Sequence, residues 1–315
     1  MRLSLVVPAT DGPPTLQRCL EAVAAAREGP DEVIVVDQPR LLGPAAARNA
    51  GAAQATGEIV AFVDADVLVH ADAFEHMRAA FGRDPELVAL FGGYDDTVAT
   101  SGLVAGFRNL LHHTVHQRSA GPAATFWAGL GAIRRDAFTV SGGFDALRYP
   151  RPSIEDVELG GRLAAAGPIL LDPALLGTHL KEWTLRSMIR TDFSSRGVPW
   201  VRLMLEQRSV PATLNVGARE RASALAALLV AAGLLRRAPL LTAAGMAAQV
   251  ALNADLYATL VRRLGVAGAV AGAGLHTVHQ LTAAAAVPAG VAAHAVSARG
   301  LMRRSRSRRP TRAGP

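Results

Sequence analysis

A continuous apolar run that stops at two carboxylates tells the most about how this chain folds. Residues 59–63 have only apolar side chains, and Asp64 and Asp66 follow directly. Residues two apart in an extended backbone point to the same side, so both carboxylates can converge while Ala65 faces the other way. Convergent carboxylates at the carboxyl end of a buried strand suit a hard divalent cation that bridges to a diphosphate. The alternative interpretation is an ordinary solvated strand end.

Two earlier segments repeat the pattern of an apolar strand followed by a helix. Residues 3–8 and 32–36 are predicted strands, and residues 16–23 and 43–51 are the helical segments that follow them. Buried strands without polar alternation, each followed by a helix, indicate a mostly parallel sheet covered on both faces. The sequence therefore predicts an α/β domain whose strands end near a common ligand.

Several motifs follow one another in a fixed order along this part of the chain. They are Val-Val-Pro at 6–8, a strand that ends in Asp37, Gly-x-x-x-Ala-Arg-Asn-x-Gly at 43–51, and Phe-Val-Asp-x-Asp at 62–66. Together they resemble the donor-binding half of the family 2 glycosyltransferases, which have the GT-A fold. The resemblance covers about residues 1–205. It implies a GT-A-like nucleotide-sugar-binding domain, followed here by apolar helices.

The resemblance also implies which residues bind the donor and its metal. The donor-binding residues would be Pro8, Thr10, Asp37, Arg48, Asp64 and Asp66, and the metal ligands for Mg²⁺ or Mn²⁺ would be Asp64, Asp66 and His179. A carboxylate such as Asp37 can accept hydrogen bonds from two ribose hydroxyls, although it could equally cap a turn. Arg48 could be a solvated helix charge instead. The family pattern departs at Gln38-Pro39, which leaves the donor base open.

An acidic pair lies about ninety residues farther along, at the start of a predicted helix. We expect this helix to begin near Ser153, which places Glu155 and Asp156 in its first turn, where the helix dipole favours carboxylates. The pair resembles the Glu-Asp motif of the same family, and the resemblance implies that Asp156 is the catalytic base. Transfer with inversion needs such a base to remove the proton of the acceptor hydroxyl. Simple helix capping is the alternative.

Glycine and aromatic residues mark the expected acceptor side. Trp127 and Gly129 resemble the acceptor loop of the family, since a glycine lets backbone approach a ligand and an aromatic face can stack on a sugar. Arg196 and Trp200 stand where processive members carry Gln-x-x-Arg-Trp, a pattern that is not met here. We therefore expect a single transfer, with these residues as acceptor contacts. Ordinary packing remains an alternative for Trp127, Arg196 and Trp200.

The remainder of the chain is apolar and then basic. Residues 222–235, 238–252 and 264–296 are almost uncharged. A membrane-spanning helix needs about 20 residues, so two tight spans compete with a re-entrant or interfacial hairpin for the first two segments, while the third is long enough to cross. A buried soluble helical domain is the other possibility. Because apolar helices follow the catalytic half, we expect residues 206–298 to form a membrane-associated region.

The last residues supply the positive charge. Seven arginines and no acid follow residue 298, which accounts for the whole formal net charge of +7. A basic segment after a long apolar helix is typical of the cytoplasmic side of a membrane, and residues 299–315 are expected to be a disordered basic tail. Nucleic-acid binding is not expected, because interleaved aromatic residues are missing. The single cysteine, Cys19, and the lack of a signal-peptide pattern in residues 1–8 favour a reducing, cytoplasmic setting.

The sequence thus predicts a metal-dependent, inverting glycosyltransferase on the cytoplasmic face of the membrane. It would move a sugar from a nucleoside-diphosphate donor to a lipid-linked acceptor, such as a polyprenyl phosphate, or to a membrane glycolipid. A nucleotidyltransferase is the first alternative, although residues 8–14 lack the glycine-rich loop that it needs. A catalytically inactive nucleotide-sugar-binding scaffold is the second. Donor sugar, acceptor, number of spans and oligomeric state stay open.

Overall fold

The apolar runs of the sequence become the central strands of one eight-stranded sheet in this computed structural model, which describes residues 1–208 and 217–307, with side chains up to 297. The strands are β1 (Leu3–Pro8), β2 (Glu32–Val36), β3 (Ile59–Val63), β4 (Val67–Val69), β5 (Ala89–Tyr94), β6 (Gly121–Ala123), β7 (Leu130–Arg134) and β8 (Ile169–His179). Their order is β2-β1-β3-β7-β5-β8-β4, and β6 pairs with β8. Strands β1, β2, β3, β5 and β8 share one direction, and β4, β6 and β7 run against them. The expected α/β sheet, mostly parallel, is confirmed.

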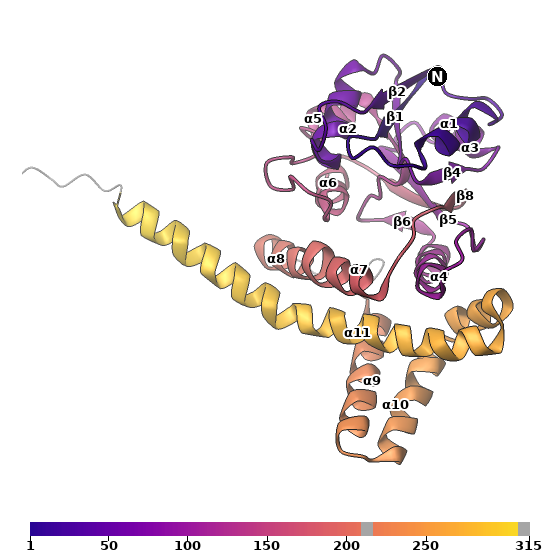
Figure 1. Cartoon of the computed structure of the whole chain (residues 1–315). Helices are drawn as coiled ribbons and strands as arrows, with labels where there is room; N and C mark the ends of the chain where they lie inside the picture. The colour runs from indigo at the N-terminus through magenta and orange to yellow at the C-terminus, as the bar shows by residue number, and fades with distance from the viewer. Residues whose placement is uncertain (209–216, 308–315) are drawn as a thin grey trace, which may run out of the picture.

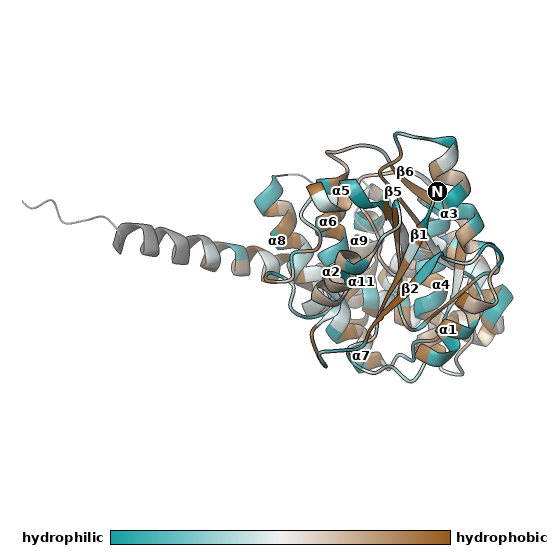
Figure 2. Ribbon diagram, turned by 90° about the horizontal axis from the view of Figure 1, so that it is seen from above, coloured by the Kyte–Doolittle hydropathy of each residue, from teal (hydrophilic) through white to brown (hydrophobic). Residues whose placement is uncertain are grey.

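Helices cover both faces of the sheet, as the uninterrupted apolar strands require. Helices α1 (Leu16–Ala24) and α3 (Ala73–Arg83) cover one face, and α2 (Pro44–Gln54), α5 (Arg135–Val140) and α6 (Glu155–Leu163) cover the other. Within β1, Leu5 and Val7 belong to the first core and Val6 to the second, which is the period of two that a strand imposes. The hydrophobic strands lie between helices with polar outer surfaces (Figure 2).

A second group of helices packs below the sheet (Figure 1). Its members are α4 (Leu103–Arg118), α7 (Leu185–Arg190), the π-helix η1 (Thr191–Gly197), α8 (Val198–Gln207), α9 (Ala218–Leu235), α10 (Pro239–Leu252) and α11 (Ala254–Ser307). Helix α11 is interrupted at Gly265, whose φ of +72° is not helical. Buried side chains of α4, α7 and α11, including Leu110, Met188 and Leu260, form a separate small core. This core fixes the first part of α11 against α4.

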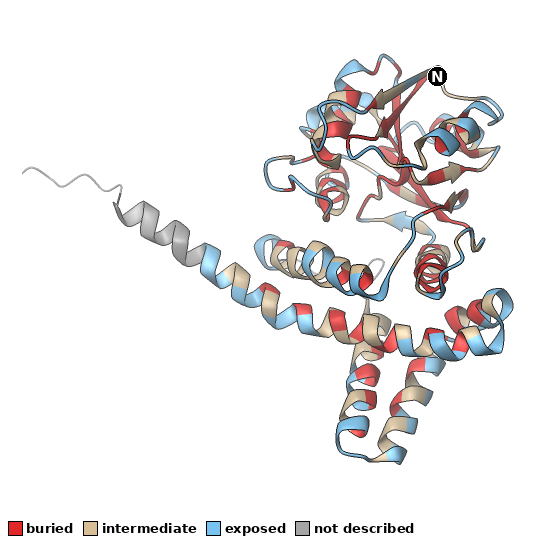
Figure 3. Ribbon diagram, viewed as in Figure 1, coloured by how far each residue is buried: buried red, intermediate tan, exposed pale blue. Residues whose placement is uncertain are grey.

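Helices α9 and α10 form an antiparallel hairpin that projects away from the α/β domain (Figure 1). The two backbones approach closely, because a Cβ on Gly233 would lie 2.5 Å from the Thr242 nitrogen and a Cβ on Gly245 would lie 2.8 Å from the Val230 nitrogen. Small residues in such contacts are typical of membrane helix pairs. The outward residues are exposed (Figure 3), among them Leu235 at 86%.

The structure leaves the predicted domain division untested. Within the described part of the chain, one helix, Ala254–Ser297, is long and apolar enough to cross a membrane by length and composition. The backbone of 299–307 continues α11, whereas the side chains of these residues and all of 308–315 lie outside the described residues. The disordered basic tail over 299–315 therefore stays a prediction.

Neighbouring glycines on α6 provide a matched test of this packing. A Cβ on Gly160 would lie 2.2 Å from the Phe126 backbone nitrogen, whereas the nearest atom to a Cβ on Gly161 is Gln207 Nε2 at 3.5 Å. We expect Gly160→Ala to lower the free energy of unfolding by about 1–3 kcal/mol through overpacking. Gly161→Ala should be neutral or stabilising by about 0.5–1 kcal/mol, since alanine is the better helix former. Urea denaturation of both variants checks this, and equal stabilities would contradict the packing of α6.

Candidate active site

The carboxylates after β3 lie at the edge where five strands of common direction end. Asp64 N–H donates to the Gly129 carbonyl at 3.0 Å, and Leu180 N–H donates to the Asp66 carbonyl at 2.8 Å. Ala65, which separates the two carboxylates in sequence, is buried in the core. The i, i+2 geometry predicted from the sequence is therefore present. It leaves the Asp64 side chain 31% exposed and the Asp66 side chain 24% exposed.

Arg48 joins this edge to the acidic pair on α6. Its guanidinium lies 2.6 Å from Asp64 Oδ1 and 3.1 Å from Glu155 Oε1, and the whole side chain is only 6% exposed. It also lies over the Phe144 ring, 5.5 Å from the ring centroid. Arg48 therefore bridges two segments 107 residues apart in sequence. In this arrangement it positions protein carboxylates, and direct contact with a nucleotide stays a prediction.

Asp156 lies in the first turn of α6, as expected, although the helix begins at Glu155 rather than near Ser153. Its carboxylate accepts hydrogen bonds from Ala128 N–H at 3.3 Å and from Val157 N–H at 2.8 Å. Burial, followed by the charge of Glu155, raises the pKa of Asp156 to about 6, although Arg48 and the two backbone donors oppose the shift. A carboxylate with this pKa is suited to accept a proton near neutral pH.

The other predicted donor residues lie at the ends of β1 and β2. Ala9 N–H donates to the Val36 carbonyl at 2.8 Å, and this bond holds the two strand ends together. Thr10 is buried at 6% exposure, Pro8 is half-buried, and Asp37 is exposed. The carboxyl ends of β1, β2 and β3 thus share one edge, although contact of these residues with a nucleotide is untested.

His179 ends β8 and faces the second carboxylate. Its Nε2 lies 3.6 Å from Asp66 Oδ2. Burial favours the neutral form of Asp66, but the contact with His179 outweighs it and lowers the pKa of this carboxyl. No three His, Cys, Asp or Glu side chains in the described ranges are grouped closely enough to hold a metal ion. Since Mg²⁺ is often held by one or two carboxylates together with substrate phosphates, Asp64 and Asp66 fit a site that a diphosphate completes.

A cavity of about 480 Å³ extends from Asp64 and Asp66 to the C-terminal helices. The sequence-predicted residues that line it are Asp64, Asp66, Trp127, His179, Arg196 and Trp200. Glu155, Asp156, Pro8, Thr10, Asp37, Arg48 and Gly129 do not line it. Gly129 lies against the Trp127 ring, because a Cβ on Gly129 would lie 2.2 Å from Cζ2 of Trp127. Glycine therefore allows the indole to fold over its own loop.

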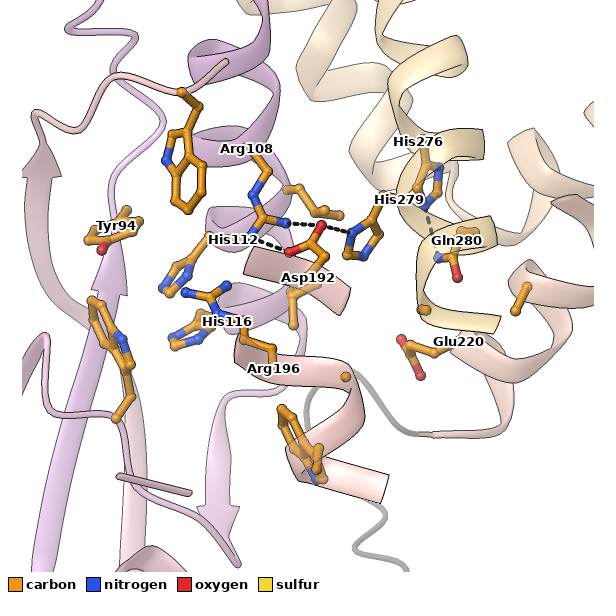
Figure 4. Close-up of a pocket in the computed structure, with 18 of the residues that line it drawn as sticks. Tyr94, Arg108, His112, His116, Asp192, Arg196, Glu220, His276, His279 and Gln280 are labelled. Carbon is orange, nitrogen blue, oxygen red and sulfur yellow. Dashed lines mark hydrogen bonds and ion pairs between the residues drawn. The ribbon is translucent and has the colours of Figure 1, made fainter. Parts of the chain in front are cut away.

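Aromatic and imidazole rings form one wall of the cavity (Figure 4). Tyr94 stacks on His179 with ring centroids 4.0 Å apart, and it lies 4.1 Å from His112, which stacks on His116 at 3.9 Å. Burial and the neighbouring His116 hold the pKa of His112 well below its usual range. Burial likewise lowers the pKa of His116 to about 4. The imidazoles of His112 and His116 are therefore neutral at physiological pH.

A charged group connects three helices on the opposite wall (Figure 4). Asp192 of η1 pairs with Arg108 of α4 at 3.0 Å and with His279 of α11 at 2.7 Å. Burial opposes the charged form of Asp192, but Arg108 and His279 prevail and lower its pKa to about 2. These contacts hold the long part of α11 against the catalytic domain.

Sequence reasoning missed the cavity residues of β5, α4, η1 and α11. They are Tyr94, Arg108, His112, His116, Asp192, His276, His279 and Gln280. One available signal was the spacing of His112 and His116, which places two histidines on one face of a helix. His276, His279 and Gln280 repeat that spacing in an otherwise apolar segment, where polar residues usually mark function.

Comparison with known proteins agrees with this arrangement. Residues 38–140 match the sequence model described as "Glycosyl transferase family 2". Two curated relatives, the pre-mycofactocin glycosyltransferases of Mycobacterium tuberculosis strains CDC 1551 / Oshkosh and ATCC 25618 / H37Rv, are each 34% identical over 175 residues. Each match covers 49% of this chain and 35% of the relative, so the chain spans about a third of the length of these relatives.

A solved structure extends the likeness to most of the chain. The mannosyltransferase PcManGT from Pyrobaculum calidifontis, in complex with GDP-Man and Mn²⁺, aligns with a TM-score of 0.53 and 16% identity. The alignment covers 91% of this chain and 86% of that chain, and it bears on the fold alone. The family model matched by residues 38–140 and the fold agree with the resemblance seen in the sequence: the α/β domain is similar to the family 2 glycosyltransferases and has a GT-A-like fold.

Proposed function

We propose that this chain transfers a sugar from a nucleoside-diphosphate donor to a membrane-proximal acceptor, with inversion at the anomeric carbon. The observation that carries the proposal is the bridge of Arg48 between Asp64 and Glu155. This bridge links the donor edge of the sheet to the helix that holds Asp156. The candidate base and the candidate donor carboxylates are thereby held in one rigid arrangement, as single-step displacement needs.

Asp66 and His179, with Asp64 beside them, would hold a divalent metal ion on the donor diphosphate. Such an ion, Mg²⁺ or Mn²⁺, supplies Lewis-acid stabilisation of the departing diphosphate. Pro8, Thr10 and Asp37 would contact the nucleoside at the ends of β1 and β2. Arg48 would keep Asp64 oriented while Asp66 stays available.

Asp156 would accept the proton of an attacking acceptor hydroxyl. As the hydroxyl oxygen forms its bond to the anomeric carbon, the bond from that carbon to the donor diphosphate breaks, and the nucleoside diphosphate leaves with the bonding electrons. The pKa of about 6 and the fixed carboxylate orientation support this role.

Donor binding can be measured by thermal protection of the purified full chain. We expect one nucleoside-diphosphate sugar from a panel to raise the Tm, and Mn²⁺ to increase the shift. Asp66→Asn should remove the Mn²⁺-dependent part, because it loses a charged metal ligand. Asp72→Asn, a change at an exposed carboxylate, is the matched control. Protection only by nucleoside triphosphates would favour a nucleotidyltransferase instead, and protection by no nucleotide would contradict the proposal.

The pH dependence of transfer tests the role of Asp156. Below about pH 6 its carboxyl binds a proton and cannot act as a base, so kcat/KM should fall about tenfold per pH unit. The charged neighbours that face it are Glu155 on its own helix and Arg48 from α2. Asp156→Asn should lower kcat by about 10²–10⁴-fold and leave donor protection intact. Full activity of this variant with an unchanged profile would exclude Asp156 as the base.

We further propose that the α9–α10 hairpin anchors the protein from the cytoplasmic face of the membrane. Helix α11 packs against α4, η1 and α8, so a crossing by α11 would carry these elements into the bilayer. The hairpin is free of such contacts at its far end, where Arg236 and Arg237 are exposed. The uncharged part of α9, residues 222–235, and helix α10 have 14 residues each, about 21 Å at 1.5 Å per residue, against a hydrocarbon core of about 30 Å. Long arginine side chains can cover the difference, which places the tip in the far headgroup layer.

Single-cysteine labelling in oriented membrane vesicles tests this topology. In a Cys19→Ser background, we expect Leu235→Cys at the hairpin tip to react with an impermeant maleimide only from the side opposite the catalytic domain. Leu147→Cys reports the catalytic side, since Leu147 is 97% exposed. Reaction of both positions from the same side would mean a re-entrant or interfacial hairpin and would overturn the proposal.

A further inference from the structure

The cavity between the catalytic domain and α11 contains hydrogen-bonding groups that lack partners. His112 Nε2 and Trp200 Nε1 are enclosed and have no hydrogen-bond partner among the described residues. Arg196 makes no hydrogen bond or ion pair within the described ranges, and Figure 4 shows its guanidinium beside His112 and His116. Buried polar groups without partners need an explanation, and a missing ligand is one.

Arg196, like Lys181, lines the cavity without an ion-pair partner within 4.0 Å in the described part of the chain, although its charge reaches Asp192. Arg108 is neutralised by Asp192 at 3.0 Å, and Arg118 is neutralised by Glu220 at 3.0 Å. His112 and His116 are neutral and cannot balance a charge. A cavity that presents a guanidinium together with an unpartnered indole N–H and an unpartnered imidazole nitrogen suits an anion rich in acceptor oxygens.

Part of the cavity wall is apolar and comes from α8 and α11, the helices next to the proposed membrane anchor. Its apolar members on these helices are Val201 and Met204 of α8 and Ala283, Ala284 and Val287 of α11. The two helices are in close contact, because a Cβ on Gly290 would lie 2.6 Å from Val201 Cβ. This wall is suited to a hydrocarbon chain and not to a second hydrated group.

We propose that this cavity binds the phosphate group of a lipid-linked acceptor that also carries the attacking hydroxyl, with Arg196, Trp200 and His112 holding the phosphate and α8 and α11 holding the lipid chain. The inference rests on the proposed function and names its acceptor class. The same cavity is lined by Asp64 and Asp66, so a ligand held there has a path to the donor carboxylates. Helix α11 is then part of the substrate site as well as part of the membrane-associated region.

A binding experiment with matched probes tests the proposal. Purified full chain in detergent micelles is titrated calorimetrically with farnesyl phosphate, farnesol or inorganic phosphate. We expect farnesyl phosphate to bind at least about ten times more tightly than either of the others, because only it offers both the charge and the chain. If farnesol bound as tightly as farnesyl phosphate, the proposed phosphate contacts would be wrong. If inorganic phosphate bound as tightly, the proposed lipid contacts would be wrong.

Variants then assign the binding to the named side chains. Arg196→Gln should weaken farnesyl phosphate binding by about 10- to 100-fold, the usual effect of losing hydrogen bonds to a charged group, and leave farnesol binding unchanged. Trp200→Phe, which keeps a ring but loses the N–H, should weaken it less. Arg190→Gln is the matched control, since Arg190 is exposed and does not line the cavity. Wild-type affinity in Arg196→Gln would overturn the proposal.

Donor protection, measured on the same samples, separates the two levels of inference. Each variant should keep the nucleotide-sugar protection of the wild type, which also shows that it is folded. If the wild type binds a nucleotide sugar but no farnesyl phosphate, only the acceptor assignment fails. If it binds no nucleotide sugar at all, the proposed function fails, whatever the result with the lipid.

Discussion

The buried guanidinium of Arg48 is the interaction on which the candidate site depends. It is paired with the partly exposed Asp64 on one side and with the buried Glu155 on the other. Removing one member of a buried ion pair leaves an uncompensated charge and is far more damaging than the net strength of the pair suggests. The sheet edge and helix α6 are therefore held together by ion pairs, and substituting Glu155 alone would leave the Arg48 charge without its buried partner. Asp156 follows Glu155 on this helix, and the N–H groups of Ala128 and Val157 orient its carboxylate.

The C-terminal helices contribute more than attachment to a membrane. Asp192 pairs with Arg108 and His279 and so connects η1, α4 and α11 around one buried carboxylate. The cavity exists only because α11 closes the side that the α/β domain leaves open. A truncated catalytic domain would retain the donor edge and lose one wall of the cavity.

The sequence predicted the parts of the site that depend on local periodicity. The side shared by Asp64 and Asp66 follows from the period of a strand, and the place of Asp156 in a first helical turn follows from the pattern of α6. The pairing of Arg48 could not be predicted, because its partner Glu155 is 107 residues away and only the folded sheet brings them together. For the same reason, the contacts of His112 with Tyr94 and Trp127 could not be predicted from the sequence. These rings meet only after α4 packs under the sheet.

The interruption of α11 at Gly265 has a mechanical consequence. Its φ of +72° suits glycine, and no atom lies within 4 Å of a Cβ built there, so backbone conformation and not crowding selects the residue. The arm before it carries Leu256 and Leu260 onto α4, while the arm after it carries His279 onto η1. A continuous helix could not bring both sets of contacts about, because its first turns would point away from the rest. With the break, the short arm turns back beside the long arm, where Tyr257 Oη lies 3.0 Å from His276 Nδ1, so that a shift of one arm on α4 is felt by the other.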